Sequence, residues 1–198
     1  MRTILFLTML AVPCFAAEPA ATILEFKGVP LGATQAELLA AHPGFRCMAD
    51  KDDAEITICM ISPRCYQSSY SAKQECEREF SARNTFGGEP NKFIMATMWL
   101  GKLHAVAVKI EPESYDRLAR ALAAKYGTPE ETREPITTRA GVSYENALAR
   151  WSFPDGFIRL RRFSGRIDEG LATIMSREMA ERAAARRKAA SNAAPSDL

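Results

Sequence analysis

The residues with the clearest chemistry are four cysteines that follow the first sixteen residues. They are Cys47, Cys59, Cys65 and Cys76, and no two of them have the C-x2-C spacing typical of a structural zinc site. An even number of cysteines in a secreted chain predicts two disulfides, for which three connectivities are possible. Pairing between neighbours, Cys47 with Cys59 and Cys65 with Cys76, is favoured because each bond would close a short excursion. We therefore expect structural disulfides and no bound metal or cofactor.

The other reactive side chains do not assemble into a catalytic set. The sequence contains no G-x-S-x-G, H-E-x-x-H, G-x-G-x-x-G or P-loop pattern. Of the two histidines, His42 precedes Pro43 at a predicted helix end and His104 stands beside a predicted hairpin turn, so structural roles are expected for both. Three acidic pairs fall in predicted turns, where carboxylates are usually solvated: Asp52-Asp53, Glu130-Glu131 and Asp168-Glu169. These observations favour a protein that is not an enzyme.

Arginines of the last predicted hairpin form the group most indicative of binding. If Asp155-Gly156 is a two-residue turn, Trp151 lies opposite Leu160 on an apolar face, and the other face carries Arg150, Arg159 and Arg161. A three-residue turn would mix the faces, so the first register is preferred. In it Arg150 lies directly opposite Arg161, which opposes strand pairing unless something anionic lies between them.

Three kinds of anionic partner suit these arginines: an acidic protein surface, a lipid phosphate or a carboxylated envelope polymer. The alternative is that carboxylates of the same chain neutralise them from neighbouring segments, with Glu145, Glu169 and Glu178 as the candidates.

Residues 1–16 have the pattern of a secretory signal peptide. Arg2 supplies the positive charge, residues 4–12 form an apolar stretch too short to span a bilayer, and a cleavage point follows Ala16. Pro13 before Cys14 does not fit a lipobox, so cleavage is expected rather than a lipid anchor. No later apolar run reaches the roughly 18 residues of a transmembrane helix. The chain is therefore expected in the periplasm, and nucleic-acid binding, which needs a cytoplasmic address, is not expected.

The composition is that of an ordinary globular protein. The 26 Lys and Arg nearly balance the 24 Asp and Glu, with 47% apolar and 25% charged residues, which excludes a disordered, collagen-like or many-spanning membrane protein. We expect one domain over 17–178, followed by a basic, Ala-rich helix and a frayed tail over 179–198. That segment lacks a large apolar face, so at most a weak peripheral contact with an anionic membrane is expected.

Outside residues 62–94, two helices and seven strands are predicted in this domain. Thr34 and Glu37 have the spacing of a capping box at the start of the first helix, and Ser114 begins a second helix that ends at Gly127. The strands are expected at 45–49, 54–61, 95–100, 103–111, 144–153, 157–164 and 171–177. This order predicts an α+β domain, with an antiparallel sheet, helices on one face, and two halves that each consist of a helix and a strand meander.

Residues 62–94 are expected to form an insertion stapled by a disulfide. A capping pattern predicts a short helix near 72–80, which would place Cys76 on a helix bonded to Cys65. Such an insertion could expose Tyr66, Tyr70 and Phe86 to a partner. The alternative is that it packs these aromatic rings on its own core.

Two short stretches resemble a known group of envelope proteins. Leu31-Gly32-Ala33-Thr34 with Glu37-Leu38, and Tyr126-Gly127-Thr128-Pro129 after the second helix, are similar to the pattern of a Leu-Gly-Thr start, a helix, a Gly-Pro end and strands. That pattern is found in the BamE (SmpA/OmlA) family and in two-repeat beta-lactamase-inhibitor proteins. The resemblance implies a protein-binding module.

We therefore expect a non-enzymatic periplasmic binding or accessory protein. It would engage an envelope protein or an anionic envelope component through Arg150, Arg159 and Arg161 or through the insertion. Two alternatives remain. One is an envelope hydrolase or isomerase that uses carboxylates not recognisable from sequence, and the other is a structural protein that self-associates through the insertion.

Overall fold

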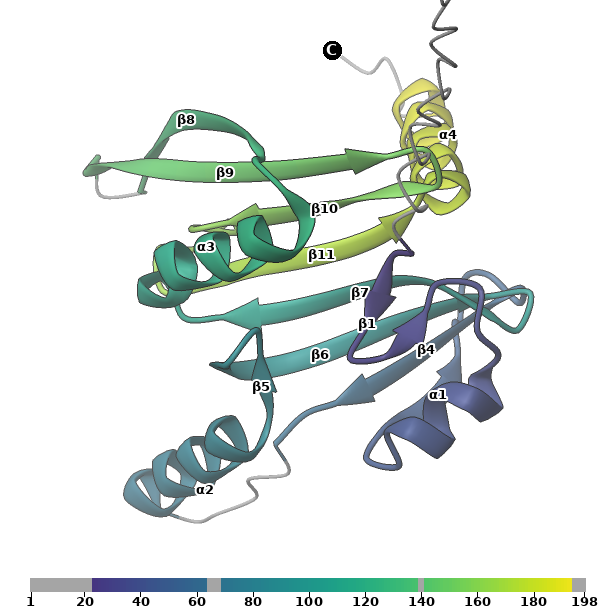
Figure 1. The fold of residues 1–198 in the computed structure, drawn as a ribbon, viewed down its shortest axis with the longest axis horizontal. Coiled ribbons are helices and arrows are strands. Elements are labelled where there is room, and N and C mark those ends of the chain that lie inside the picture. Colours follow the sequence, from purple (N-terminus) through teal and green to yellow (C-terminus); the bar gives the residue numbers. More distant parts are fainter. Residues whose placement is uncertain (1–22, 64–68, 139–140, 194–198) are drawn as a thin grey trace, which may run out of the picture.

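One antiparallel sheet organises the molecule (Figure 1), of which a computed structural model describes residues 23–63, 69–138 and 141–193. The strands of the sheet are β3 (Arg46–Ala49), β4 (Ile56–Ile61), β5 (Thr85–Phe86), β6 (Glu89–Trp99), β7 (Lys102–Ile110), β8 (Glu130–Thr137), β9 (Ser143–Phe153), β10 (Gly156–Arg161) and β11 (Gly170–Ser176). They lie in the order β3-β4-β6-β7-β11-β10-β9-β8, with β5 paired to β6. A separate two-stranded hairpin consists of β1 (Glu25–Phe26) and β2 (Val29–Pro30). The predicted α+β class is confirmed.

Two helices cover one face of the sheet, which we call the helix face. They are α1 (Gln35–Ala41) and α3 (Tyr115–Tyr126), and α3 follows a short 3-10 helix, η1 (Pro112–Ser114). The predicted capping box is present: the Glu37 backbone N–H donates to Thr34 Oγ1 at 3.3 Å, and the Thr34 N–H donates to Glu37 Oε2 at 2.7 Å. Ser114, in contrast, caps no helix with its side chain, because its hydroxyl donates to Glu89 Oε2 at 2.8 Å.

The main core lies between the helix face and these helices. Leu38 of α1 and Leu118 of α3 are fully buried in it against Val106, Trp151 and Ile174 of the sheet. Apolar side chains at alternate positions along each strand supply this layer, as expected for strands with one face in the core.

The last helix, α4 (Arg177–Ala193), begins on the opposite face, which we call the reverse face. Its Met179 is buried against Ile56 and Ala105, and Trp99 and Met175 pack against the same cluster. The predicted gathering of helices on one face thus describes α1 and α3 but not α4. The reason is that both faces of the central strands carry apolar side chains, so the reverse face also needs cover.

The final strand joins the two halves of the sheet. The first half, after α1, consists of β3, β4, β6 and β7, and the second, after α3, consists of β8 to β11. Because β11 pairs with β7 on one side and β10 on the other, the only ladder between the halves in the described sheet is formed by the last strand of the chain.

The turn of the β9–β10 hairpin differs from the expected one. Its two turn residues are Pro154 and Asp155, and Gly156 pairs with Phe153. Gly156 is the first residue of β10. Only glycine fits there, because a Cβ would come within 2.2 Å of the carbonyl oxygen of Met175 on β11. The predicted register is therefore wrong by two residues, but an even shift leaves every side chain on its predicted face. Arg150 consequently lies opposite Arg159 rather than opposite Arg161.

The β6–β7 hairpin also turns one residue earlier than expected. Leu100 and Gly101 both have positive φ, 50° and 76°, as in a type I′ turn, and the register shifts between Thr97 and Met98. The register of β6 against β7 therefore differs on the two sides of this shift. Met98 lies in the main core together with Val106.

The insertion is shorter and more ordered than expected. The predicted Cys47–Cys59 disulfide is present, between directly paired residues of β3 and β4. Cys76 lies on α2 (Tyr70–Arg83) and is disulfide-bonded, while its predicted partner Cys65 lies outside the described residues. Strand β6 begins at Glu89, inside the range expected for the insertion.

The aromatic rings of the insertion have different environments. Phe86 is buried and stacks on Phe26 with ring centroids 6.1 Å apart, so of the two possibilities for this ring, packing on the core is the one observed. Tyr70 is 77% exposed at the start of α2, and Tyr66 lies outside the described residues. No helix among the described residues is both long and apolar enough to cross a membrane. The predicted signal peptide (1–16) and the end of the predicted tail (194–198) also fall outside the description.

Candidate functional site

The candidate site is a group of arginines on the reverse face, at its β9–β10 end. Arg150 of β9 and Arg159 of β10 are directly paired, and Arg161 follows two residues further along the same face. We call these three residues the arginine cluster. Phe157 supports it, with its ring centroid 4.5 Å from the guanidinium carbon of Arg150 and 5.8 Å from that of Arg159. Cation–π contacts of this kind hold guanidinium groups without neutralising them.

The positive charge of the cluster is not compensated. Burial lowers the pKa of Arg159, and the charges of Arg161, Arg150 and Arg187 lower it further. The Nε atoms of Arg159 and Arg161 are buried and have no hydrogen-bond partner, and Arg150 Nε donates only to the neutral Ser152 Oγ, at 3.1 Å. A partly buried positive charge without a counter-charge is unfavourable, and an anion between the guanidinium groups would relieve it.

The carboxylates that could have neutralised the cluster are engaged elsewhere. Glu145 pairs with Arg133, Glu169 pairs with Lys109 at 2.9 Å, and Glu178 lies 3.6 Å from Nδ1 of His104. Glu130 on β8 is the register partner of Arg150, but the two side chains form no ion pair, and no other carboxylate within the described ranges pairs with the cluster. The predicted internal neutralisation is therefore wrong.

Helix α4 borders the cluster and is held in place by its own arginines. Arg182 donates to Asp53 Oδ2 at 2.7 Å and to Glu55 Oε2 at 2.9 Å, and its guanidinium lies 4.8 Å from the centroid of the Trp99 ring. Arg177 donates to the carbonyl oxygens of Phe153 and Pro154. Arg177 and Arg182 therefore attach α4 to the rest of the fold. Asp53 accepts a hydrogen bond from Arg182 and is not the solvated turn residue that was expected.

A groove runs between α4 and the β9–β10 end of the sheet. Its volume is about 430 Å³, and its walls include Arg150 and Phe157 from the sheet and Ala180 and Ala184 from α4. Arg187, one turn beyond Ala184, is exposed and adds its charge to the field around Arg159. No residue pattern near Arg187 indicates that the basic C-terminal segment packs beside β10.

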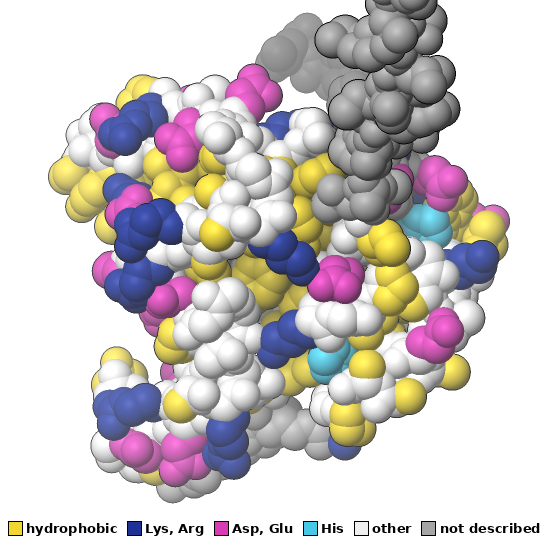
Figure 2. All heavy atoms as spheres, viewed as in Figure 1, with side chains coloured by type: hydrophobic (Ala, Val, Ile, Leu, Met, Phe, Trp, Pro, Cys, Tyr) yellow, Lys and Arg dark blue, Asp and Glu magenta, His cyan; other side chains and the backbone are white. Residues whose placement is uncertain are grey.

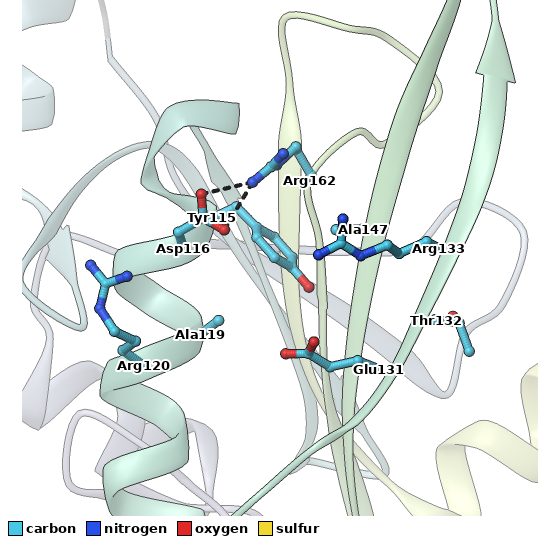
Figure 3. Close-up of a pocket in the computed structure, with 9 residues that line it drawn as sticks. All are labelled: Tyr115, Asp116, Ala119, Arg120, Glu131, Thr132, Arg133, Ala147 and Arg162. Carbon is cyan, nitrogen blue, oxygen red and sulfur yellow. Dashed lines mark hydrogen bonds and ion pairs between the residues drawn. The ribbon is translucent and has the colours of Figure 1, made fainter.

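A second pocket, of about 220 Å³, lies on the helix face between α3 and strands β8 and β9 (Figure 3). Asp116 and Glu131 both line it, and Asp116 accepts two hydrogen bonds from Nη2 of Arg162, at 2.8 and 2.9 Å. Burial and the charge of Glu131 raise the pKa of the Tyr115 hydroxyl to about 12, so at neutral pH this group is a proton donor rather than a base. Glu131 lies on β8 rather than in the expected turn.

The remaining predicted residues are not brought to the cluster. Arg162, the next residue after Arg161, lies on the helix face over the Tyr115 ring. Tyr70 begins α2, which lies at the far side of the molecule from α4 (Figure 1). His42 packs between Phe26 and Phe45, and His104 Nδ1 lies 2.9 Å from Ser176 Oγ. No group of three or more potential metal ligands occurs among the residues that the structure describes.

Comparison of the chain with protein-family models, with curated proteins and with solved structures finds no match. The resemblance to the BamE family and to two-repeat beta-lactamase-inhibitor proteins therefore stays a prediction. The features that indicate a function are the arginine cluster and the surface around it.

Proposed function

We propose that the protein is a non-enzymatic binding or accessory protein that captures an anionic partner of the cell envelope with the arginine cluster. The observation that carries the proposal is the arrangement of Arg150, Arg159 and Arg161, which share one face with no carboxylate of the described residues paired to them. Such a group stabilises the fold less than apolar or paired residues would, so its retention suits a surface that binds an anion.

The proposed location is the periplasm. The signal-peptide pattern of residues 1–16 supports export, and the Cys47–Cys59 disulfide fits an oxidising compartment. A periplasmic protein would meet anionic groups on envelope proteins, on lipids and on polymers.

The test is crosslinking in intact cells with a triple variant, Arg150→Ser, Arg159→Ser and Arg161→Ser. We expect the variant to fold and to lose the partner that the wild-type protein captures. The matched control replaces three exposed arginines elsewhere, Arg78, Arg120 and Arg166, by Ser, which lowers the net charge equally. Capture that is unchanged in the first variant, or lost equally in both, would reject the cluster as the binding site.

The alternative of a hydrolase or isomerase is favoured by one observation, the pair of carboxylates in the pocket of Figure 3. In that reading Glu131 would act as the acid or base and Tyr115 as a hydrogen-bond donor. Asp116 is bound to Arg162 by two hydrogen bonds and is therefore not assigned this role. Glu131→Gln would abolish turnover of an envelope substrate if this alternative were right, and it would leave partner capture unchanged if the binding function is right.

A further inference from the structure

The arginine cluster is one end of a larger exposed surface. The register of the strands places side chains of the reverse face in rows that cross the sheet. One row contains Arg150, Arg159, Thr173, Ala107, Met95 and Met60, and the next contains Leu148, Arg161, Leu171, Lys109 and Phe93. Each row starts on the edge strand β8, with Glu130 in the first row and Thr132 in the second, passes the arginines on β9 and β10, and continues over β11, β7 and β6.

The part of these rows beyond the arginines is mostly apolar and only partly covered. Leu171, Met95, Phe93 and Met60 are half-buried, and Met48 at the far edge is 54% exposed. We call Met60, Phe93, Met95 and Leu171 the apolar strip. Helix α4 packs mainly against β7, β10 and β11, and it also reaches Ile56 of β4 and Trp99 of β6 at the end of the face where Met179 is buried. An antiparallel sheet that faces water on one side normally carries polar side chains there, so an uncovered apolar strip indicates an interaction surface.

The two faces also differ in charge. Figure 2 shows the helix face, where basic and acidic side chains are interspersed. On the reverse face Arg150, Arg159 and Arg161 lie together without a paired carboxylate among the described residues, although Glu181 of α4 lines the same groove as Arg150, and within the strip rows Lys109 is bound to Glu169. A partner that complements this face must be acidic over the cluster and apolar over the strip.

We propose that the reverse face binds an acidic, amphipathic segment of a partner protein, whose carboxylates contact Arg150, Arg159 and Arg161 and whose apolar side chains cover the strip. This inference rests on the proposed function and deepens it, since it states the chemistry of the partner. A bilayer is the less suitable occupant for a geometric reason. A helix packed on a sheet rises about 10 Å above it, so a flat membrane would touch α4 before it reached the apolar strip. A single chain segment fits beside α4.

The experiment measures binding of three probes to the full-length mature protein. The first is a fluorescent peptide with glutamates along one side and leucines along the other. The second has the same composition in scrambled, non-amphipathic order, and the third is a vesicle of phosphatidylglycerol and phosphatidylcholine. We expect the first peptide to bind at least about tenfold more tightly than the second, because burial of even two leucines contributes that much. Binding of the vesicle without binding of the first peptide would overturn the inference in favour of a lipid surface.

Two variants separate this inference from the proposed function. Met95→Ser with Leu171→Ser should reduce binding of the amphipathic peptide to the level of the scrambled one. The matched control, Val142→Ser with Ile167→Ser, changes two exposed apolar residues elsewhere and should have no effect. If wild-type protein binds both peptides equally and the arginine triple variant binds neither, the apolar strip is rejected and the anion-binding function stands. If the arginine triple variant binds both as wild type does, the proposed function fails as well.

Discussion

Arg159 occupies a position that disfavours its own charge. Its guanidinium is partly buried, it lies across from Arg150, and Arg161 and Arg187 add further positive charge around it. Two nearby arginines show the contrast: Arg162, directly after β10, is paired with Asp116, and Arg133, on β8, is paired with Glu145. Several positive charges placed this close together reduce the stability of the fold. Binding of an anion therefore explains the cluster better than a contribution to stability does.

Arg159→Gln should therefore change the response of the protein to salt. Added NaCl screens repulsion between the arginines, so the wild-type melting temperature should rise between 50 and 500 mM NaCl, and the rise should be smaller in the variant. Thermal denaturation followed by circular dichroism measures both. Arg166→Gln is the control, since Arg166 pairs with Asp168 at 2.7 Å and its loss removes an attraction. An equal rise in the wild type and in Arg159→Gln would contradict the repulsion.

The two histidines make the fold sensitive to acid. Burial lowers the pKa of His42 and of His104, and the charge of Lys27 acts in the same direction on His42, whereas the nearby Glu178 partly opposes the shift of His104. The unfolded chain then binds more protons than the folded chain below about pH 6.5, the ordinary histidine pKa. The free energy of unfolding should be constant just above that pH and should fall as the pH drops below it.

Urea unfolding at pH 7.5 and pH 5.5 measures this dependence. We expect a lower unfolding free energy at pH 5.5, and a smaller difference between the two values in a His42→Gln, His104→Gln variant. Titration of the imidazole NMR signals would give both pKa values directly. Values above 6.5 for both rings in the folded protein would show that burial is not the dominant influence.

At the scale of elements, the helix expected in the basic C-terminal segment is present as α4, but its attachment to the reverse face was not expected. Its sequence is basic and alanine-rich, which is typical of a solvated segment. Its first turns nevertheless attach to the sheet, because Met179 is buried there and Arg182 forms ion pairs with the β3–β4 turn. The outer residues from Ala184 to Ser191 are exposed. The helix therefore borders the arginine cluster with its anchored half and presents Arg187 from its exposed half.

Arg182→Gln should release α4 from the sheet. The substitution removes both ion pairs, to Asp53 and Glu55, and the contact with Trp99, which leaves Met179, the Arg186–Asp53 ion pair and the hydrogen bonds of Arg177 as attachments. Hydrogen–deuterium exchange should become faster over residues 179–191 and stay unchanged in α3. Arg187→Gln, one of the exposed positions, should leave the exchange of α4 at the wild-type rate. Unchanged exchange in Arg182→Gln would show that the remaining attachments are sufficient to hold the helix.

At the scale of the whole molecule, the position of β11 makes the two halves one folding unit. The β7–β11 ladder joins them, so neither half has its full set of strand neighbours until residues 170–176 are in place. This arrangement has a high sequence separation between paired strands, which is associated with slow folding. It also predicts a single cooperative unfolding transition.

Ile174→Ala should test this coupling, because Ile174 is buried in the centre of β11. We expect a loss of about 3 kcal/mol in unfolding free energy, as for other large-to-small substitutions in a core. The two tryptophans report on different halves, Trp99 on β6 and Trp151 on β9, so single-tryptophan variants can follow each half during urea unfolding. Both reporters should shift to the same lower midpoint. A shift of the Trp151 reporter alone would show that the halves unfold independently.

Much of the local structure and part of the candidate site were predictable from the sequence. The capping box of Thr34 and Glu37, the position of α3, the seven predicted strands and the Cys47–Cys59 pair depend on residues close together in the chain. Strand β8 was not predicted, because Glu130 and Glu131 were expected in a turn. The shared face of Arg150, Arg159 and Arg161 was also predictable, because side chains alternate along a strand and an even register shift preserves the alternation.

Only the tertiary structure decided which residues are neighbours across the sheet and whether the arginines are neutralised. In the tertiary structure Gly156 pairs with Phe153 on β9 and lies close to Met175 on β11, and the insertion of β11 between β7 and β10 brings distant segments together. The absence of a paired carboxylate depends on where Glu145, Glu169 and Glu178 find other partners, and Arg187 reaches the cluster only because α4 packs on the reverse face. These outcomes depend on contacts between segments far apart in the chain, about which local residue patterns carry no information.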